Sequence, residues 1–143
     1  MYQVLLLCSD NSVLSPMAEG YFRQLMPEDA EVFSAGIARG KINSMAIKVM
    51  QEDKIDISGL HQNILLDLRH IDFDYVLTFD QESEAESHHL PSKPVKYHYD
   101  FDKILSPENG KNTEEKYRNV RDQIKKIIRS FIKEHFVQTT NSK

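Results

Sequence analysis

Cysteine occurs only once in this chain of 143 residues, at Cys8, and tryptophan is absent. One cysteine excludes an internal disulfide, which separates the chain from disulfide-stapled secreted domains. Apolar runs are short, and none approaches the roughly 20 residues that a membrane-spanning helix needs. The amino end has no basic leader followed by a long apolar segment, so we expect a cytoplasmic protein without a membrane partner.

Clustered positive charge is missing as well. Lys and Arg number 18 against 22 Asp and Glu, which gives a net charge of −4. Nucleic acids and anionic membranes are bound by patches of Lys and Arg, so we expect neither as a partner. Hydrophobic residues make up 40% of the chain, enough for one domain with a core. We expect residues 1–137 to form this domain, as a monomer or weak homodimer, and residues 138–143 to form a flexible C-terminal tail.

Strands and helices are predicted to alternate along the chain. Short apolar runs predict strands at residues 2–7, 31–35, 75–79 and 95–99. The segments between and after them predict helices that follow Ser15 and Asn43, cover 63–68 and 82–89, and close the chain. The predicted helix caps are Ser15 before Pro16, Asn43, and Asn112 with Glu115. This order predicts an α/β layer structure whose ligand site lies beyond the carboxyl ends of the strands.

Cys8 stands where the first predicted strand passes through a polar loop into a helix. We call residues 8–15, Cys-Ser-Asp-Asn-Ser-Val-Leu-Ser, the Cys8 loop. Loop N–H groups and a helix amino terminus both favour an anion, and such surroundings lower the pKa of a cysteine toward a nucleophilic thiolate. The pattern therefore predicts a phosphate-binding site around Cys8. Its expected anion-binding positions are Ser9, Asp10, Asn11, Ser12, Val13 and Leu14.

The stretch from Val4 to Gly20 resembles the active-site signature of low-molecular-weight protein tyrosine phosphatases and of the related thioredoxin-coupled arsenate reductases. Residues 33–37, Phe-Ser-Ala-Gly-Ile, and residues 72–78, Asp-Phe-Asp-Tyr-Val-Leu-Thr, resemble further elements of this superfamily. The likeness thus spans nearly the whole chain. It implies a three-layer α/β sandwich with a central four-stranded parallel sheet, strand order 2-1-3-4, and helices on both faces.

The same resemblance implies roles for the Cys8 loop. Cys8 corresponds to the nucleophile, Ser15 to the hydroxyl that hydrogen-bonds its sulfur, and Asn11 to the residue that keeps the loop in shape. No cofactor is implied. The expected ligand is a phosphorylated or other anionic group, such as that of a phosphotyrosine protein.

Leu14 stands where the family carries an arginine. The planar fork of that arginine binds two phosphoryl oxygens, and a charged arginine in phosphoryl transfer contributes roughly 10³–10⁵ in rate. We therefore expect weak or no phosphotyrosine phosphatase activity, and a Cys8 less acidic than in a relative with the arginine. Arg39, with Lys41 near it, is a candidate for replacement positive charge; both also fit ordinary solvated loop positions.

The general acid is predicted after the last strand, because relatives carry an aspartate there to protonate the leaving group. Asp102 is the expected acid and Asp100 the second choice. Residues 78–90 contain no cysteine, so the two redox cysteines of arsenate reductases are missing. On this ground we expect that the chain is not an arsenate reductase.

Two functions remain open at this point. One is a degenerate phosphatase-fold protein that binds a phosphorylated or anionic partner; the other is a divergent cysteine-dependent phosphoester hydrolase with another substrate. A metal site is another reading of the sequence, with the candidate ligands His88, His89, His98, Asp100 and Asp102. Their spacing fits no established motif, and we expect no metal.

Overall fold

The computed structural model describes residues 1–105 and 114–136. Its elements, in chain order, are β1 (Tyr2–Cys8), α1 (Leu14–Gln24), β2 (Ala30–Gly36), α2 (Ser44–Glu52), β3 (Asn63–Ile64), α3 (Leu65–Leu68), β4 (Tyr75–Thr78), α4 (Gln81–Ser87), β5 (Val95–His98), α5 (Asp102–Leu105) and α6 (Glu114–His135). The predicted cap at Asn112 and the predicted tail 138–143 lie outside the described residues.

The strands form one parallel sheet in the order β3-β2-β1-β4-β5, with β1 in the centre. The predicted α/β class and the parallel sheet are confirmed, but the predicted count of four strands is wrong. The fifth strand is β3, which pairs Asn63 and Ile64 with Ala35 and Gly36 and lies at the edge beyond β2. Two residues are too few to show a strand pattern in the sequence, and the prediction had assigned them to a helix. The four predicted strands correspond to β1, β2, β4 and β5, and their order in the sheet, β2-β1-β4-β5, is the predicted one.

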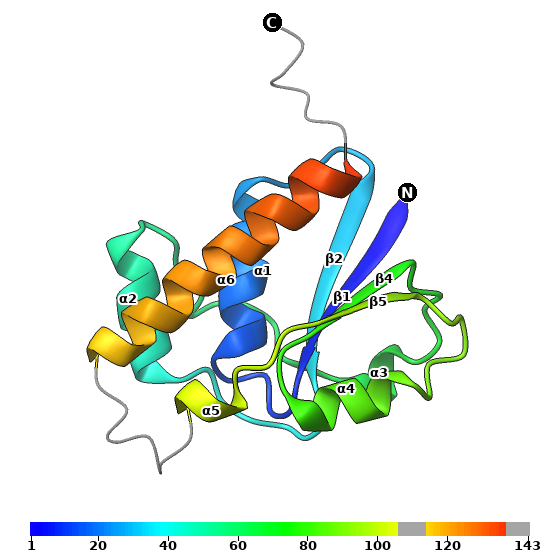
Figure 1. Cartoon of the computed structure of the whole chain (residues 1–143), viewed down its shortest axis with the longest axis horizontal. Coiled ribbons are helices and arrows are strands. Elements are labelled where there is room, and N and C mark those ends of the chain that lie inside the picture. Colours follow the sequence, from blue (N-terminus) through cyan, green and yellow to red (C-terminus); the bar gives the residue numbers. More distant parts are fainter. Residues whose placement is uncertain (106–113, 137–143) are drawn as a thin grey trace, which may run out of the picture.

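Helices cover both faces of the sheet (Figure 1). One face packs against α1 and α6, with α2 beside α6, and the other lies against α3 and α4. β1 serves both layers, because alternate side chains of a strand point to opposite faces. Val4 and Leu6 belong to the larger core, whereas Leu5 and Leu7 belong to the smaller one, and all four are fully buried. A central strand buried on both faces delivers Cys8 to the carboxyl edge of the sheet.

The helix starts differ from the sequence prediction at one functional position. α1 begins at Leu14, its cap residue is Val13, and no side chain caps it, so the predicted cap at Ser15 is wrong. The hydroxyl of Ser15 bonds within the Cys8 loop instead. The cap at Asn43 is confirmed, because its side chain accepts from the N–H groups that begin α2. α5 was not predicted.

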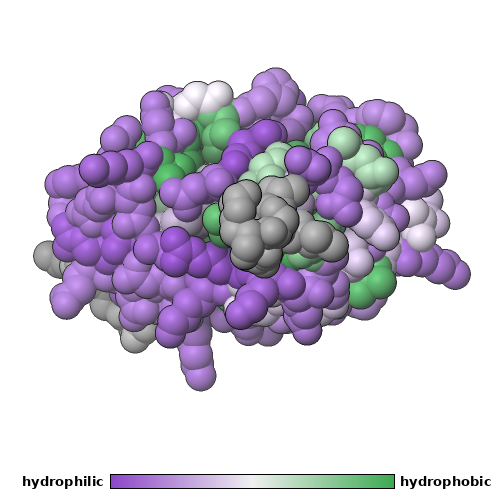
Figure 2. Space-filling model, turned by 90° about the horizontal axis from the view of Figure 1, so that it is seen from above, coloured by the Kyte–Doolittle hydropathy of each residue, from purple (hydrophilic) through white to green (hydrophobic). Residues whose placement is uncertain are grey.

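The described residues that are visible on the side where the strands begin form a mostly polar surface (Figure 2). Figure 2 shows that side as mostly hydrophilic, with hydrophobic side chains in small separate groups. No helix within residues 1–105 and 114–136 is long and apolar enough to cross a membrane.

Candidate active site

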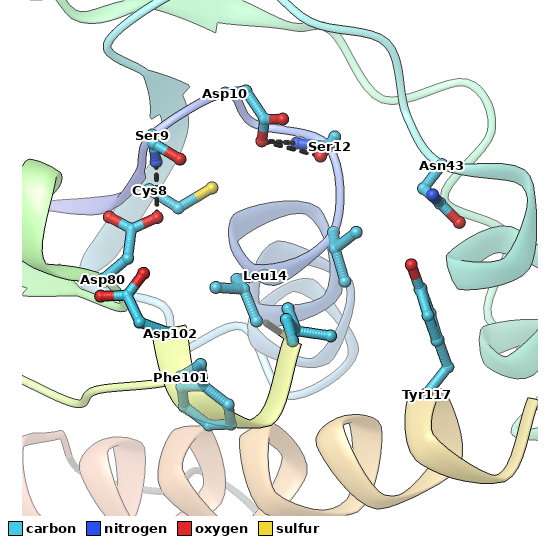
Figure 3. Close-up of a pocket in the computed structure, with 12 residues that line it drawn as sticks. Cys8, Ser9, Asp10, Ser12, Leu14, Asn43, Asp80, Phe101, Asp102 and Tyr117 are labelled. Carbon is cyan, nitrogen blue, oxygen red and sulfur yellow. Dashed lines mark hydrogen bonds between the residues drawn. The ribbon is translucent and has the colours of Figure 1, made fainter. Parts of the chain in front are cut away.

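A cavity of about 400 Å³ opens over Cys8, at the carboxyl ends of β1 and β4 (Figure 3). We call it the Cys8 pocket. The Cys8 loop, the residue that caps α2, the turn after β4, α5 and the start of α6 enclose it. The lining residues are Cys8, Ser9, Asp10, Ser12, Val13, Leu14, Asn43, Asp80, Phe101, Asp102, Leu105 and Tyr117. This position agrees with the expectation that ligands of parallel sheets lie beyond the carboxyl ends of the strands.

Cys8, Ser15 and Asn11 form a buried chain of hydrogen bonds. The sulfur of Cys8 lies 2.9 Å from Ser15 Oγ, and the Ser15 hydroxyl donates to Asn11 Oδ1 at 2.7 Å. Because a hydroxyl has one proton, the Cys8 thiol is then the donor to Ser15. Asn11 has a positive φ of 57°, a backbone conformation that asparagine tolerates better than most residues. These hydrogen bonds therefore correspond to a resting state in which Cys8 carries its proton.

Asn11 Nδ2 is buried and has no hydrogen-bond partner. A rotation of the Asn11 amide by half a turn would let Nδ2 donate to Ser15 Oγ. The Ser15 hydroxyl proton would then be free to bond the sulfur of Cys8 in its thiolate form. The same three residues can thus serve either protonation state of Cys8.

Burial controls the acidity of Cys8. The residue is 1% exposed, and burial raises the pKa of its thiol from 9.0 to about 11. A hydrogen bond from Ser15 to the thiolate lowers this pKa, while the negative charge of Asp80 raises it. The loop alone predicted a lowered pKa; in the folded chain desolvation exceeds the effect of the loop. Cys8 is protonated at neutral pH in this state.

Two N–H groups of the Cys8 loop already donate to carboxylates of the chain itself. The N–H of Ser9 donates to Asp80 Oδ2 at 2.9 Å. The N–H of Ser12 donates to Asp10 Oδ1 at 3.2 Å, and the Ser12 hydroxyl donates to the same oxygen at 2.7 Å. Figure 3 shows both carboxylates at the rim around Cys8. An anionic ligand that used these N–H groups would compete with internal negative charge.

Leu14 is 5% exposed and projects into the Cys8 pocket beside Phe101 and Asp102 (Figure 3). The charged residues in the lining are three aspartates, and no Lys or Arg of the described residues lines the pocket. Arg39 and Lys41 are exposed and lie outside the lining, so a role for either in ligand binding stays a prediction.

Asp102 lies in the pocket wall, whereas Asp100 does not. Asp102 is the first residue of α5, and its Oδ2 accepts the backbone N–H of Gln81 at 2.8 Å. Asp100 instead accepts the backbone N–H of Asp102 at 2.9 Å. This geometry favours Asp102 over Asp100 as the proton donor. Within residues 1–105 and 114–136, no three His, Cys, Asp or Glu side chains form a group that could hold a metal ion.

Sequence reasoning missed Asp80 and Tyr117. Asp80 caps α4 in a capping box with Ser83, and the pair is visible in the sequence as an aspartate followed three residues later by a serine after an apolar run. Tyr117 is a buried residue of α6, the helix that was predicted to close the chain. Its hydroxyl points toward Asn43 across the pocket, and burial raises the pKa of this phenol. Only the fold shows that α6 contributes to the pocket.

Neighbouring segments hold the backbone of the Cys8 loop. The carbonyl of Ser9 accepts the N–H of Ile37 at 2.8 Å, and the carbonyl of Asn11 accepts Gln62 Nε2 at 2.9 Å. Gly40 lies so close that a Cβ there would stand 2.4 Å from the carbonyl oxygen of Asp10. The loop is therefore preformed by contacts with the segments that follow β2.

A parallel α/β sheet whose central strand delivers a cysteine into a polar loop at a helix start defines a cysteine-phosphatase type of fold. Residues 3–141 match the family described as low molecular weight phosphotyrosine protein phosphatase, and the chain belongs to this family.

Its relatives include proteins named arsenate reductase. One from Staphylococcus aureus (strain bovine RF122 / ET3-1) is 37% identical over 87% of this chain and 92% of its own length. Arsenate reductase 1 of Staphylococcus haemolyticus is also 37% identical, over 87% of this chain and 90% of its own length. A solved structure of an arsenate reductase in the phosphate binding state is 25% identical, with a TM-score of 0.72 over 94% of this chain and 98% of that one.

These relatives correct one expectation. The absence of cysteine from residues 78–90 suggested that the chain is not an arsenate reductase, and the similarity to proteins of that name contradicts this. The inference was wrong because it judged the whole chain by one short segment, while the likeness extends over 87% of the sequence.

Proposed function

We propose that this chain is a low-molecular-weight phosphatase-like protein whose Cys8 pocket binds a phosphorylated or other oxyanionic group, and that it hydrolyses phosphotyrosine weakly or not at all. The observation that carries the proposal is that Cys8 and Leu14 both line this pocket. A buried thiol bonded to Ser15 is retained, while Leu14 stands where phosphoryl transfer needs a cationic fork.

Weak catalysis follows from two further features. The nucleophile must be a thiolate, but burial keeps Cys8 protonated at neutral pH. The described lining also contains three carboxylates and no Lys or Arg, so charge that develops on a phosphoryl group meets repulsion. Both features oppose the same step, the attack of Cys8 on phosphorus.

A second candidate is a divergent cysteine-dependent phosphoester hydrolase that acts on another substrate. Asp102 in the pocket wall supports it, because a carboxyl group near the nucleophile is what a leaving group needs as proton donor. A substrate that brings its own positive charge would also offset the aspartates around Cys8.

Kinship to proteins named arsenate reductase supports a third candidate, thiol-dependent reduction of arsenate. The sulfur of Cys8 would replace one oxygen of arsenate, which leaves as water. A thiol from outside the chain would then attack that sulfur and form a disulfide, leaving the electron pair of the sulfur–arsenic bond on arsenic as arsenite. A second external thiol would restore Cys8. Both reducing thiols are external, because the chain has one cysteine.

Turnover of p-nitrophenyl phosphate and of a phosphotyrosine peptide tests the main proposal. We expect rates at least about 10³ lower than those of a relative that carries the arginine. Any residual turnover should disappear in Cys8→Ser. Turnover close to that of the relative, and lost in Cys8→Ser, would contradict the proposal. Formation of arsenite from arsenate with dithiothreitol or reduced thioredoxin, again with Cys8→Ser as control, tests the third candidate.

A further inference from the structure

Asp80 joins the Cys8 loop to the start of α4. Its Oδ2 accepts the N–H of Ser9, the residue after the nucleophile, at 2.9 Å. Its Oδ1 accepts the N–H of Ser83 at 3.1 Å and so closes the capping box of α4. Both carboxylate oxygens are engaged, and Asp80 is 6% exposed. One buried side chain therefore connects two elements that are 71 residues apart in the sequence.

The charge of Asp80 faces the reacting sulfur. Figure 3 shows its carboxylate beside Cys8 and next to Asp102 on the same wall of the pocket. The other titratable groups in the described lining are Asp10 across the loop and Tyr117 of α6, and no cation is among them. Asp80 also occupies a loop N–H that could otherwise bind an oxyanion.

We propose that Asp80 is a positioning residue that clamps the Cys8 loop to α4 and opposes the negative charge that Cys8, or an oxyanion over it, must carry. The ligand half of this inference rests on the proposed function; the clamp and its effect on Cys8 do not. Release of the clamp, by a shift of α4 or by a positively charged group on a ligand, would free the Ser9 N–H for the ligand and favour the thiolate.

Asp74 provides a matched control. It lies just before β4, as Asp80 lies just after it, and its Oδ2 accepts the backbone N–H of Gln3 at 2.8 Å. Gln3 is at the opposite end of β1 from Cys8. Asp74→Asn therefore removes one negative charge and alters one hydrogen bond from a backbone N–H to a carboxylate, as Asp80→Asn does. It does so at the other ends of β1 and β4, away from the thiol.

The test is the rate of alkylation by iodoacetamide between pH 7 and 12, for wild type, Asp80→Asn and Asp74→Asn. Cys8 is the only cysteine, so the rate reports on one sulfur. We expect Asp80→Asn to lower the midpoint of the pH profile by about one pH unit, which makes alkylation about tenfold faster below that midpoint. The profile of Asp74→Asn should coincide with that of wild type.

A loosened loop would also lower the midpoint, because it relieves the burial that raises the pKa of Cys8. Ser83→Ala separates the two effects, since it weakens the same capping box and leaves the charge of Asp80 in place. An unmoved midpoint in Asp80→Asn, or an equal shift in Ser83→Ala, overturns the inference. If Asp80→Asn does not fold, as judged by circular dichroism, Asp80→Ser carries the same expectation, because serine caps helices without a charge.

Protection by inorganic phosphate separates this inference from the proposed function. We expect phosphate to slow alkylation at a lower concentration in Asp80→Asn than in wild type. A lowered midpoint with no protection in any variant would support the clamp and count against an oxyanion pocket. Protection at the same phosphate concentration in both proteins, with an unmoved midpoint, would support the pocket and overturn the clamp.

Discussion

Ser15 Oγ lies 2.9 Å from the sulfur of Cys8 at the buried floor of the pocket. Because the Ser15 hydroxyl donates its proton to Asn11 Oδ1 at 2.7 Å, Ser15 can accept a hydrogen bond from the thiol of Cys8. It has no proton left to donate to the thiolate. A change of protonation at Cys8 thus requires a rearrangement of its hydrogen-bond partners.

Ser15→Ala should raise the pKa of Cys8 further, since it removes the hydroxyl that can donate to the thiolate once the Asn11 amide has turned, and that hydrogen bond lowers the pKa. The change also leaves the buried Asn11 Oδ1 without a donor, which should reduce the free energy of unfolding by about 1–3 kcal/mol. Urea unfolding and pH-dependent alkylation measure the two effects. Ser12→Ala is the control, because the Ser12 hydroxyl bonds only in an exposed setting; equal losses in both variants would refute the importance of the buried bond.

Leu14→Arg should create phosphatase activity. A guanidinium at this position would stand in the pocket and favour both the thiolate and a phosphoryl group. We expect turnover of p-nitrophenyl phosphate to rise at least about tenfold and the pKa of Cys8 to fall, within the roughly 10³–10⁵ that such an arginine supplies. Leu14→Met, which keeps an apolar side chain, should change neither. A folded Leu14→Arg without any gain would show that Leu14 is not what limits the reaction.

Asp102→Asn and Asp100→Asn distinguish the two candidate acids. Asp102 lines the pocket and Asp100 does not, so only the first change should slow turnover of a substrate with a poor leaving group, by about 10²-fold or more. Substrates with a good leaving group need no proton and should be less affected. The comparison of phenyl phosphate with p-nitrophenyl phosphate, under single-turnover conditions, reports this difference; a larger effect from Asp100→Asn would reverse the assignment.

Gly40→Ala should destabilise the Cys8 loop. A Cβ at Gly40 would stand 2.4 Å from the carbonyl oxygen of Asp10, so the backbone must shift, at a cost of about 1–3 kcal/mol in unfolding free energy. Gly59→Ala has open space around its Cβ and should be neutral or slightly stabilising. Thermal unfolding compares the two; similar midpoints would mean that the close approach at Gly40 relaxes freely.

Stability should fall in alkaline solution because of Cys8. Its folded pKa is about 11 against an ordinary 9.0, so the folded state binds this proton more tightly than the unfolded state does. The contribution of Cys8 to the free energy of unfolding is fully present below pH 9 and is lost as the pH rises through 11. The loss amounts to about 3 kcal/mol. Urea unfolding at pH 8 to 10.5 should show a shallower decline in Cys8→Ala. Tyr21, whose pKa burial also raises, contributes in the same direction, and Tyr21→Phe isolates its share.

Several parts of the fold were readable from local patterns. The apolar run before Cys8 predicted a strand, and the asparagine at position 43 predicted a helix cap, because both signals lie within a few neighbouring residues. β3 was missed, since two residues pair only when the edge of β2 is already present. The start of α1 was misplaced because Ser15 resembles a cap, while its hydroxyl bonds to Asn11.

The sequence by itself determined the parallel α/β class, the loop that presents Cys8, and the replacement of a cationic fork by Leu14, since these depend on residue type and order along the chain. Only the tertiary structure decided that Asp80 and Asp102 stand beside that loop and that Cys8 is a protonated thiol. The reason is physical: burial and the charges that surround a group depend on which distant segments fold against it.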